Sequence, residues 1–300
     1  MTIAQILKFS ADKLIARGID TPFLEAEILL SHVLKKPQEF LFTHGEKKLS
    51  SLQISSFKFQ ISKRLKDVPA AYLTSHKEFY GLDFKVNQNI LIPRPETELM
   101  VDEALKLVAH GSQSATILDV GTGSGCIIIA LAKQIKNYEL PITNYKFIAT
   151  DISAKALALA KQNAKAHHVN KKIKFIKGNL LEPITKNNKF VIRNSKFVIT
   201  ANLPYLTPTQ IKNSSSIKYE SKSALDGGLD GLRYYKRLFK QIKQLRVAGC
   251  GLRDITILCE IDPRQTAKIK LFAKQLLPKA KLQIKKDLSG LNRLAIVKII

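Results

Sequence analysis

The stretch of sequence that decides the fold is Ile-Leu-Asp-Val-Gly-Thr-Gly-Ser-Gly-Cys, at residues 117–126. Apolar residues of strand length lead into three glycines, and an apolar helical segment, residues 127–132, follows them. Glycines let a chain turn tightly and approach a ligand without interference from a Cβ atom. The spacing differs from the Gly-x-Gly-x-x-Gly of dinucleotide sites, and no Gly-Lys-Ser/Thr follows to hold phosphate. The stretch therefore predicts a strand, a ligand-binding loop and a helix in succession.

Around this unit, residues 110–300 alternate strand-like apolar runs with helical segments. The alternation predicts a parallel sheet whose crossover connections are helices. Two runs, 189–192 and 196–199, resemble each other, and we assign the second to the sheet because it leads directly to Asn202. A Ser- and Lys-rich segment, residues 213–223, predicts a mobile surface loop. The candidate strands are residues 115–120, 146–150, 174–177, 196–201, 254–260 and 293–299.

Polar residues stand at the ends of the first three strands. Asp119 is placed to pair with an ammonium group, which favours a cofactor that carries an amino acid. Asp151 is placed to accept hydrogen bonds from both hydroxyls of a ribose, as the acidic residue does in dinucleotide folds. Carboxyl ends of parallel strands meet at one edge of a sheet, so these residues should converge on one crevice. The candidate cofactor-binding residues are Asp119, Gly121, Thr122, Gly123, Ser124, Gly125, Asp151, Ile152, Asn179, Leu180 and Asn202.

The fourth strand ends at Asn202-Leu203-Pro204-Tyr205. An Asn side chain offers a carbonyl acceptor and an NH2 donor. The carbonyl of Leu203 has a restricted direction because the residue before a proline is pushed to extended conformations. Tyr205 supplies a flat face against which a planar group can stack. Two acceptors beside an aromatic ring suit a planar NH2 group, either an amide or the exocyclic amine of adenine, and we expect these four residues to bind the substrate and catalyse its reaction.

A glycine loop, a strand-end acid, a polar third strand end and Asn-x-Pro-Tyr on the fourth together resemble the class I S-adenosylmethionine methyltransferases that modify NH2 groups. The chain is similar, over nearly its full length, to the bacterial release-factor glutamine methyltransferases, the PrmC/HemK family. The matching blocks are residues 72–84, 91–98, 118–126, 149–153, 202–205, 224–232 and 286–293.

The resemblance implies an α/β fold: a Rossmann-like class I methyltransferase domain with a mostly parallel seven-stranded sheet. It implies a helical domain for substrate recognition at residues 1–71, a β-hairpin linker at 72–92 and a catalytic domain at 93–300. The implied activity is methyl transfer from S-adenosylmethionine to the side-chain amide of the glutamine in the Gly-Gly-Gln loop of class I peptide-chain release factors. No metal is implied.

Two departures from the family pattern leave alternatives open. Leu203 stands where the family has proline, and Asn-Leu-Pro-Tyr resembles ribosomal-RNA adenine dimethyltransferases. Asn179 replaces a residue that is commonly acidic in the family. The alternatives are an rRNA adenine methyltransferase, a glutamine methyltransferase that acts on a ribosomal protein, and a non-catalytic RNA-binding protein on a decayed methyltransferase scaffold.

The first 70 residues predict helices. One begins near Ile3 and ends at Gly18, a second follows the cap Thr21-Pro22 and runs to Leu34, and a third begins after Ser50. Residues 78–86 and 89–92 then predict short strands of a hairpin.

Composition indicates a globular intracellular protein. The chain has 300 residues, 45% of them hydrophobic, and a formal charge of +25. The charge favours weak contact with RNA or the ribosome, or else reflects a lysine-rich composition. Three cysteines without metal-ligand spacing predict a reducing cytoplasm, and Cys126 should be a packing residue. We expect a monomer without membrane association or a signal peptide.

Overall fold

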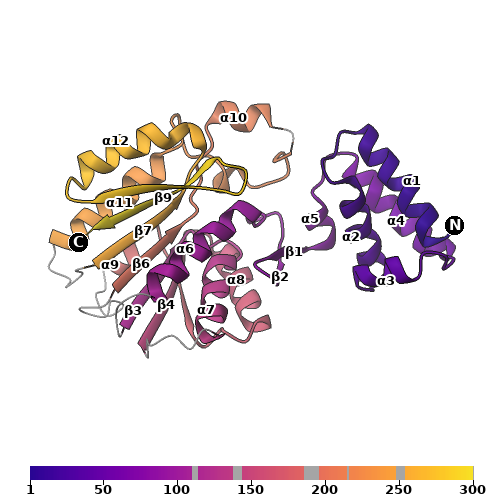
Figure 1. Cartoon of the computed structure of the whole chain (residues 1–300), viewed down its shortest axis with the longest axis horizontal. Helices are drawn as coiled ribbons and strands as arrows, with labels where there is room; N and C mark the ends of the chain where they lie inside the picture. Colours follow the sequence, from indigo (N-terminus) through magenta and orange to yellow (C-terminus); the bar gives the residue numbers. More distant parts are fainter. Residues whose placement is uncertain (110–113, 138–143, 186–195, 215, 248–253, 300) are drawn as a thin grey trace. The chain divides into compact units, whose positions relative to one another are not determined.

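The computed structural model describes residues 1–109, 114–137, 144–185, 196–214, 216–247 and 254–299 (Figure 1). The chain forms two compact units, and each contains segments that are distant in sequence. The first unit is Met1–His76 together with Ser214–Tyr219, and the second is Lys77–Asn213 together with Glu220–Ile300.

The first unit is a small helical bundle. Capping boxes at Thr2 and Ser50 begin two of its helices, where each hydroxyl accepts a backbone N–H and a Gln side chain three residues later accepts the cap's own N–H. Phe57 is fully buried in the core of the bundle. The Tyr219 hydroxyl donates to the Lys66 carbonyl at 2.9 Å, which ties the distant segment to this unit. The helices are α1 (Ile3–Ala16), α2 (Pro22–Leu34), α3 (Gln38–Thr43), α4 (Ser51–Arg64) and α5 (Ala70–Thr74).

The second unit is built on a seven-stranded sheet with the order β5-β4-β3-β6-β7-β9-β8. The first five strands in this order are parallel, and β9 is antiparallel to both of its neighbours. The predicted mostly parallel seven-stranded sheet is therefore confirmed. The strands are β3 (Ser114–Val120), β4 (Asn144–Asp151), β5 (Ile173–Lys177), β6 (Lys196–Ala201), β7 (Asp254–Glu260), β8 (Lys281–Lys286) and β9 (Asn292–Ile299).

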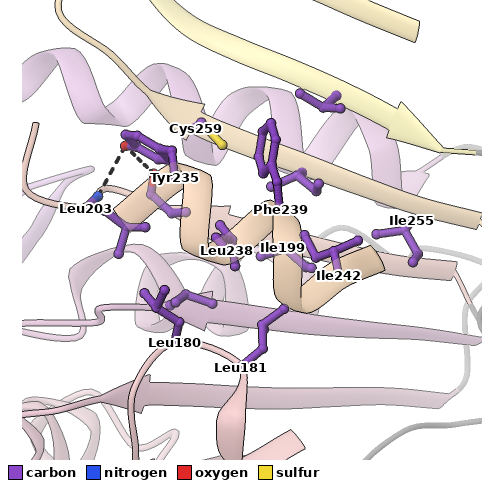
Figure 2. Packing of buried hydrophobic residues seen from close by; sticks show 14 of the residues in the cluster. Leu180, Leu181, Ile199, Leu203, Tyr235, Leu238, Phe239, Ile242, Ile255 and Cys259 are labelled. Atoms are coloured by element: carbon purple, nitrogen blue, oxygen red, sulfur yellow. Dashed lines mark hydrogen bonds between the residues drawn. The ribbon is translucent and has the colours of Figure 1, made fainter. Parts of the chain in front are cut away.

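Side chains alternate between the two faces of the sheet, so its core has two halves. Leu118 and Ile199 belong to one buried cluster with α11 (Arg233–Val247) and α12 (Thr266–Leu276). Figure 2 shows Leu238, Phe239 and Ile242 of α11 packed over this face. Ile117 and Val198 belong to the second cluster with α6 (Glu98–Ala109) and α7 (Cys126–Asn137). The carboxyl ends of the strands are thereby fixed between helical layers.

Shorter elements complete the second unit. The hairpin consists of β1 (His76–Phe79) and β2 (Leu82–Lys85), and Asn163 of α8 (Ala154–Ala166) accepts from the Lys85 N–H at 2.9 Å. The remaining elements are the helices α9 (Glu182–Thr185) and α10 (Pro208–Asn213) and the 3-10 turns η1 (Pro95–Thr97), η3 (Lys222–Ala224) and η4 (Pro263–Gln265). Within the described residues, no helix has the length and apolarity that crossing a membrane requires.

Three local expectations differ from the structure. Residues 89–92 form no strand, and residues 89–91 instead line a cavity. The prediction of a surface loop at 213–223 is wrong for Glu220, whose buried carboxylate accepts from Arg94 and from the Ile92 N–H. The strand β8 was not recognised, since its Lys-rich sequence at the sheet edge has only two apolar positions. Residues 189–192 lie outside the described part of the chain.

Candidate active site

One cavity, of about 280 Å³, lies at the carboxyl ends of β3, β4, β5 and β6. The predicted segments at all four strand ends reach its wall, so the strand order brings together residues that are up to 83 positions apart. Part of the lining comes from residues that precede the sheet. The cavity is lined by residues 89–91, Pro93, Thr97, residues 121–124, Cys126, Ile127, residues 151–153, Ala156, residues 178–180, residues 202–204, Ser223, Ala224 and Tyr234.

The glycine loop is held against the end of β4. The N–H groups of Gly121 and Thr122 both donate to the Thr150 carbonyl, at 2.8 and 3.0 Å. Gly121 has φ +73°, and a Cβ atom there would lie 3.0 Å from Cδ2 of Leu203. The position therefore requires glycine both for its backbone conformation and for the close approach of the loop to the Asn202 turn.

Asp119 lies behind the loop and is not part of the cavity wall. Its carboxylate accepts from the Thr122 hydroxyl at 2.6 Å and from the Thr200 hydroxyl at 2.8 Å, and only 1% of the residue is exposed. Burial raises the pKa of Asp119 to about 6, although the two hydroxyl hydrogen bonds oppose the shift. In this position Asp119 orients Thr122, which itself lines the cavity.

Asp151 lies at the cavity wall, with Ile152 beside it. Its two carboxylate oxygens accept one backbone N–H each, from Gly123 at 2.9 Å and from Ser153 at 2.8 Å. Burial raises the pKa of Asp151, and these N–H groups oppose the rise because they stabilise the charged form. Each oxygen retains a lone pair for a ligand hydroxyl.

The Asn202 side chain is held at its nitrogen end only. Its NH2 group donates to the hydroxyl of Thr97 at 3.1 Å. Its carbonyl oxygen is buried and has no hydrogen-bond partner among the described residues. Buried polar atoms in native proteins nearly always have a partner, so an unsatisfied acceptor at a cavity wall indicates a ligand-binding group.

The Leu203 backbone is braced by a buried tyrosine on α11. The Leu203 N–H donates to the Tyr235 hydroxyl at 3.3 Å, as Figure 2 shows. That hydroxyl in turn lies beside the carbonyls of Ala201 and Glu260 and is fully buried. A proline at position 203 has no N–H for this bond. The hydrogen bond to Tyr235 thus holds the turn where a proline ring holds it in the family pattern.

Tyr205 and Glu260 form a hydrogen-bonded pair next to the Asn202 turn. The Tyr205 hydroxyl donates to Glu260 at 3.1 Å, and Tyr205 does not line the cavity. The other carboxylate oxygen of Glu260 accepts from the Thr97 hydroxyl at 2.6 Å. Burial raises the pKa of Glu260, while the two hydroxyls and the positive charge of Arg293 oppose the rise. Burial and Glu260 raise the pKa of Tyr205 well above its usual range, which keeps its hydroxyl protonated.

The sequence analysis assigned no site role to Thr97, Tyr234, residues 89–91 or Pro93, which all line this cavity. The block at 91–98 was a usable signal, because two prolines beside a charged residue mark a rigid corner before the sheet begins.

Cys126 also reaches the cavity wall and is 7% exposed. Burial raises the pKa of its thiol to about 12, so it remains uncharged and acts as a small packing residue.

Comparison with known proteins gives two matching family models. The PrmC N-terminal domain matches residues 5–74, and a methyltransferase domain matches residues 112–225. The release factor glutamine methyltransferase of Aliivibrio fischeri is 37% identical over 75% of this chain and 74% of its own length. That of Geobacter sulfurreducens is 34% identical over 78% of this chain and 77% of its own. The chain belongs to the release factor glutamine methyltransferase family.

Other relatives of the family are longer than this chain. A bifunctional methyltransferase of Rickettsia prowazekii is 38% identical over 90% of the chain but only 52% of its own length. The chain thus spans about half the length of these relatives. Among solved structures, the catalytic domain of human METTL16 in complex with an RNA hairpin has a TM-score of 0.57, with 17% identity over 90% of both chains. The N-terminal domain of human METTL16 in complex with SAH has a TM-score of 0.54 and 19% identity over 90% of this chain and 93% of its own. This similarity shows the methyltransferase fold.

Proposed function

We propose that this protein transfers the methyl group of S-adenosylmethionine to the side-chain amide nitrogen of the glutamine in the Gly-Gly-Gln loop of class I peptide-chain release factors. The observation that carries the proposal is the Asn202 side chain, whose NH2 group is held by Thr97 while its oxygen has no partner in the described part of the chain. An unpaired acceptor beside a glycine-lined cavity suits a substrate that brings an N–H donor. The amide of a glutamine is such a substrate.

The residues of the cavity fit S-adenosylmethionine. Gly121 leaves the wall open where a Cβ atom would approach Leu203, and Asp151 retains acceptors for ribose hydroxyls. Asn179 and Leu180 would border the adenine, and residues 122–124 together with Asn202 would surround the amino-acid part. Gly125 (φ +81°) does not line the cavity and would shape the loop. Asp119 would act through Thr122, whose hydroxyl it holds. When bound, the cofactor supplies an electrophilic methyl carbon on a sulfonium centre.

The chain's own residues would then position the substrate amide. An amide nitrogen is a poor nucleophile because its lone pair is delocalised into the carbonyl. The oxygens of the Asn202 side chain and the Leu203 backbone would accept its two N–H bonds, which fixes the nitrogen and favours its rehybridisation. Pro204 holds the turn, and Tyr205 braces it through Glu260. Positioning of this kind lowers a barrier by up to ~7–11 kcal/mol. No base need act beforehand, since the product can lose its proton after transfer.

The organisation of the chain follows the same proposal. Residues 1–71 would recognise the release factor, residues 72–92 would link the two parts, and residues 93–300 would catalyse the reaction as a monomer in the cytoplasm. A second candidate, methylation of a glutamine in a ribosomal protein, needs the same amide-binding geometry. The charge of +25 keeps an rRNA adenine substrate as a third candidate.

A methyl-transfer assay with labelled S-adenosylmethionine separates these substrates. The enzyme is offered a release factor with its loop glutamine intact, the same factor with that glutamine replaced by alanine, ribosomal proteins, and deproteinised ribosomal RNA. We expect label in the intact release factor alone. Label in the alanine variant at the same level, or in RNA only, would contradict the proposal.

A further inference from the structure

We propose that Thr97, acting with Glu260, determines which end of the Asn202 side-chain amide faces the substrate. Thr97 would thus be a positioning residue for the methyl transfer. The inference rests on the proposed function and deepens it, because it explains how the site distinguishes a carboxamide from a carboxylate.

The three residues come from elements that are distant in sequence. Thr97 ends η1, Asn202 follows β6 and Glu260 ends β7. Thr97 and Glu260 are each 2% exposed, so water does not compete for their hydrogen bonds. The Thr97 hydroxyl is 2.6 Å from a Glu260 oxygen and 3.1 Å from the Asn202 side-chain nitrogen.

The direction of each hydrogen bond follows from the number of available protons. A threonine hydroxyl has one proton and two lone pairs. The Thr97 hydroxyl donates its proton to a Glu260 side-chain oxygen, so only lone pairs are left for Asn202. Tyr205 donates to the other Glu260 oxygen, so the carboxylate is approached by two donors. A side chain that faces lone pairs must present its NH2 group, which leaves the Asn202 oxygen for another donor.

The orientation of this amide matters because the two ends select opposite substrates. An outward oxygen accepts an N–H of glutamine but repels the carboxylate of glutamate. An outward NH2 group would do the reverse. The buried Asn202 oxygen, which has no partner among the residues that the structure describes, is the acceptor that this arrangement makes available. Removal of the Thr97 hydroxyl would free the amide to rotate and weaken the preference for glutamine.

The test compares wild type, Thr97→Val and Thr97→Ser. Valine keeps the shape of threonine without its hydroxyl, and serine keeps the hydroxyl. With a release factor as substrate, kcat of Thr97→Val should fall about 10- to 100-fold, as expected when a preorganised hydrogen bond is lost. The Kd of S-adenosylmethionine, measured by calorimetry, should stay within about twofold. Thr97→Ser should recover most of the lost kcat.

A second measurement has an outcome that a purely structural role would not give. A release factor with glutamate in place of the loop glutamine is used as a competitive inhibitor. In wild type, the inhibition constant of this glutamate form should be much larger than the KM of the glutamine form. In Thr97→Val the ratio of the two constants should fall about tenfold, because an inverted Asn202 amide donates a hydrogen bond to the carboxylate of the glutamate. An unchanged ratio with unchanged kcat would overturn the inference. A fall in kcat of Thr97→Val would also overturn the inference if Thr97→Ser did not recover it and if cofactor affinity and Tm fell to a matching extent.

A third measurement requires no substrate, and it uses a variant only to assign one signal. In 15N-labelled wild-type enzyme, one Asn202 side-chain N–H, assigned by its absence in Asn202→Ala, should exchange slowly with solvent. Rapid exchange of both protons would contradict the hydrogen bond to Thr97. If wild type methylated no release factor, the proposed function would fail, and slow exchange would still support the orientation of Asn202 by Thr97.

Discussion

Replacement of Tyr235 by phenylalanine should lower the free energy of unfolding by about 1–3 kcal/mol, because the buried N–H of Leu203 loses its only acceptor among the described residues. The ring is fully buried and remains in the variant, so no large cavity forms. The Tyr235 hydroxyl has one proton, so one of the carbonyls of Ala201 and Glu260 also loses a donor. The cost therefore arises at Leu203 and at that carbonyl. Because the variant also loosens the Asn202 turn, kcat should fall while the Kd of S-adenosylmethionine stays similar.

Equilibrium unfolding in urea measures this change, and the chain offers a matched control. The hydroxyl of Tyr145 is buried but has no hydrogen-bond partner in the described structure. Tyr145→Phe removes the same atom without breaking a hydrogen bond, so it should be neutral or stabilising. If Tyr235→Phe and Tyr145→Phe changed the unfolding free energy equally, the bracing of Leu203 would be refuted.

A double-mutant cycle isolates the Leu203 N–H. Leu203→Pro removes that N–H as well as the side chain, which packs over Gly121. In the Tyr235→Phe background no hydrogen bond remains to be lost, so Leu203→Pro should be less destabilising there than in wild type. A coupling energy of about 1 kcal/mol is expected for residues in direct contact, and strict additivity would contradict it.

Two further predictions concern the support of the site. The pKa of Asp119, about 6 in the fold, lies above the ordinary value of 3.8, so the native state keeps a proton that the unfolded chain loses. The unfolding free energy of wild type, relative to Asp119→Asn, should thus fall by about 2.4 kcal/mol as pH rises from about 4 to about 7; a constant difference in urea titrations would contradict this. At Gly231 (φ +70°), a Cβ atom would lie 2.0 Å from Gln265 Nε2 and 2.2 Å from the Tyr205 carbonyl oxygen. Gly231→Ala should therefore be more destabilising, by thermal unfolding, than Gly290→Ala, which has φ +78° but open space; equal losses of stability would refute the close packing on Tyr205.

The part of the site that could be predicted from sequence depends on one geometric rule. Parallel strands present their carboxyl ends at the same edge, so residues after β3, β4, β5 and β6 could be grouped without coordinates. Each of these segments has a local signal, either glycines, a strand-end acid or a proline. The helices of residues 1–70 and the parallel sheet followed from apolar periodicity and capping residues, and the number of seven strands followed from the resemblance of the blocks.

The parts that could not be predicted depend on hydrogen bonds over long separations. Thr97 reaches Asn202 across 105 residues, and Thr97 reaches Glu260 across 163. Nothing in a Thr of a first helical turn or a Glu at a strand end indicates such a partner, because packing of the two elements decides it. The same holds for Asp119, which looks like a ligand-binding acid in sequence but is enclosed by two threonine hydroxyls.

The central claim, that the oxygen of Asn202 binds the substrate amide, is tested most directly by single-turnover methyl transfer with Asn202→Ala. The variant should transfer the methyl group to a release factor at least about 10- to 100-fold more slowly, since a buried donor of the substrate loses its acceptor. Its Kd for S-adenosylmethionine, measured on the same preparation, should rise by a much smaller factor, because Asn202 is one of several residues around the amino-acid part of the cofactor. A single-turnover rate equal to wild type would contradict the claim.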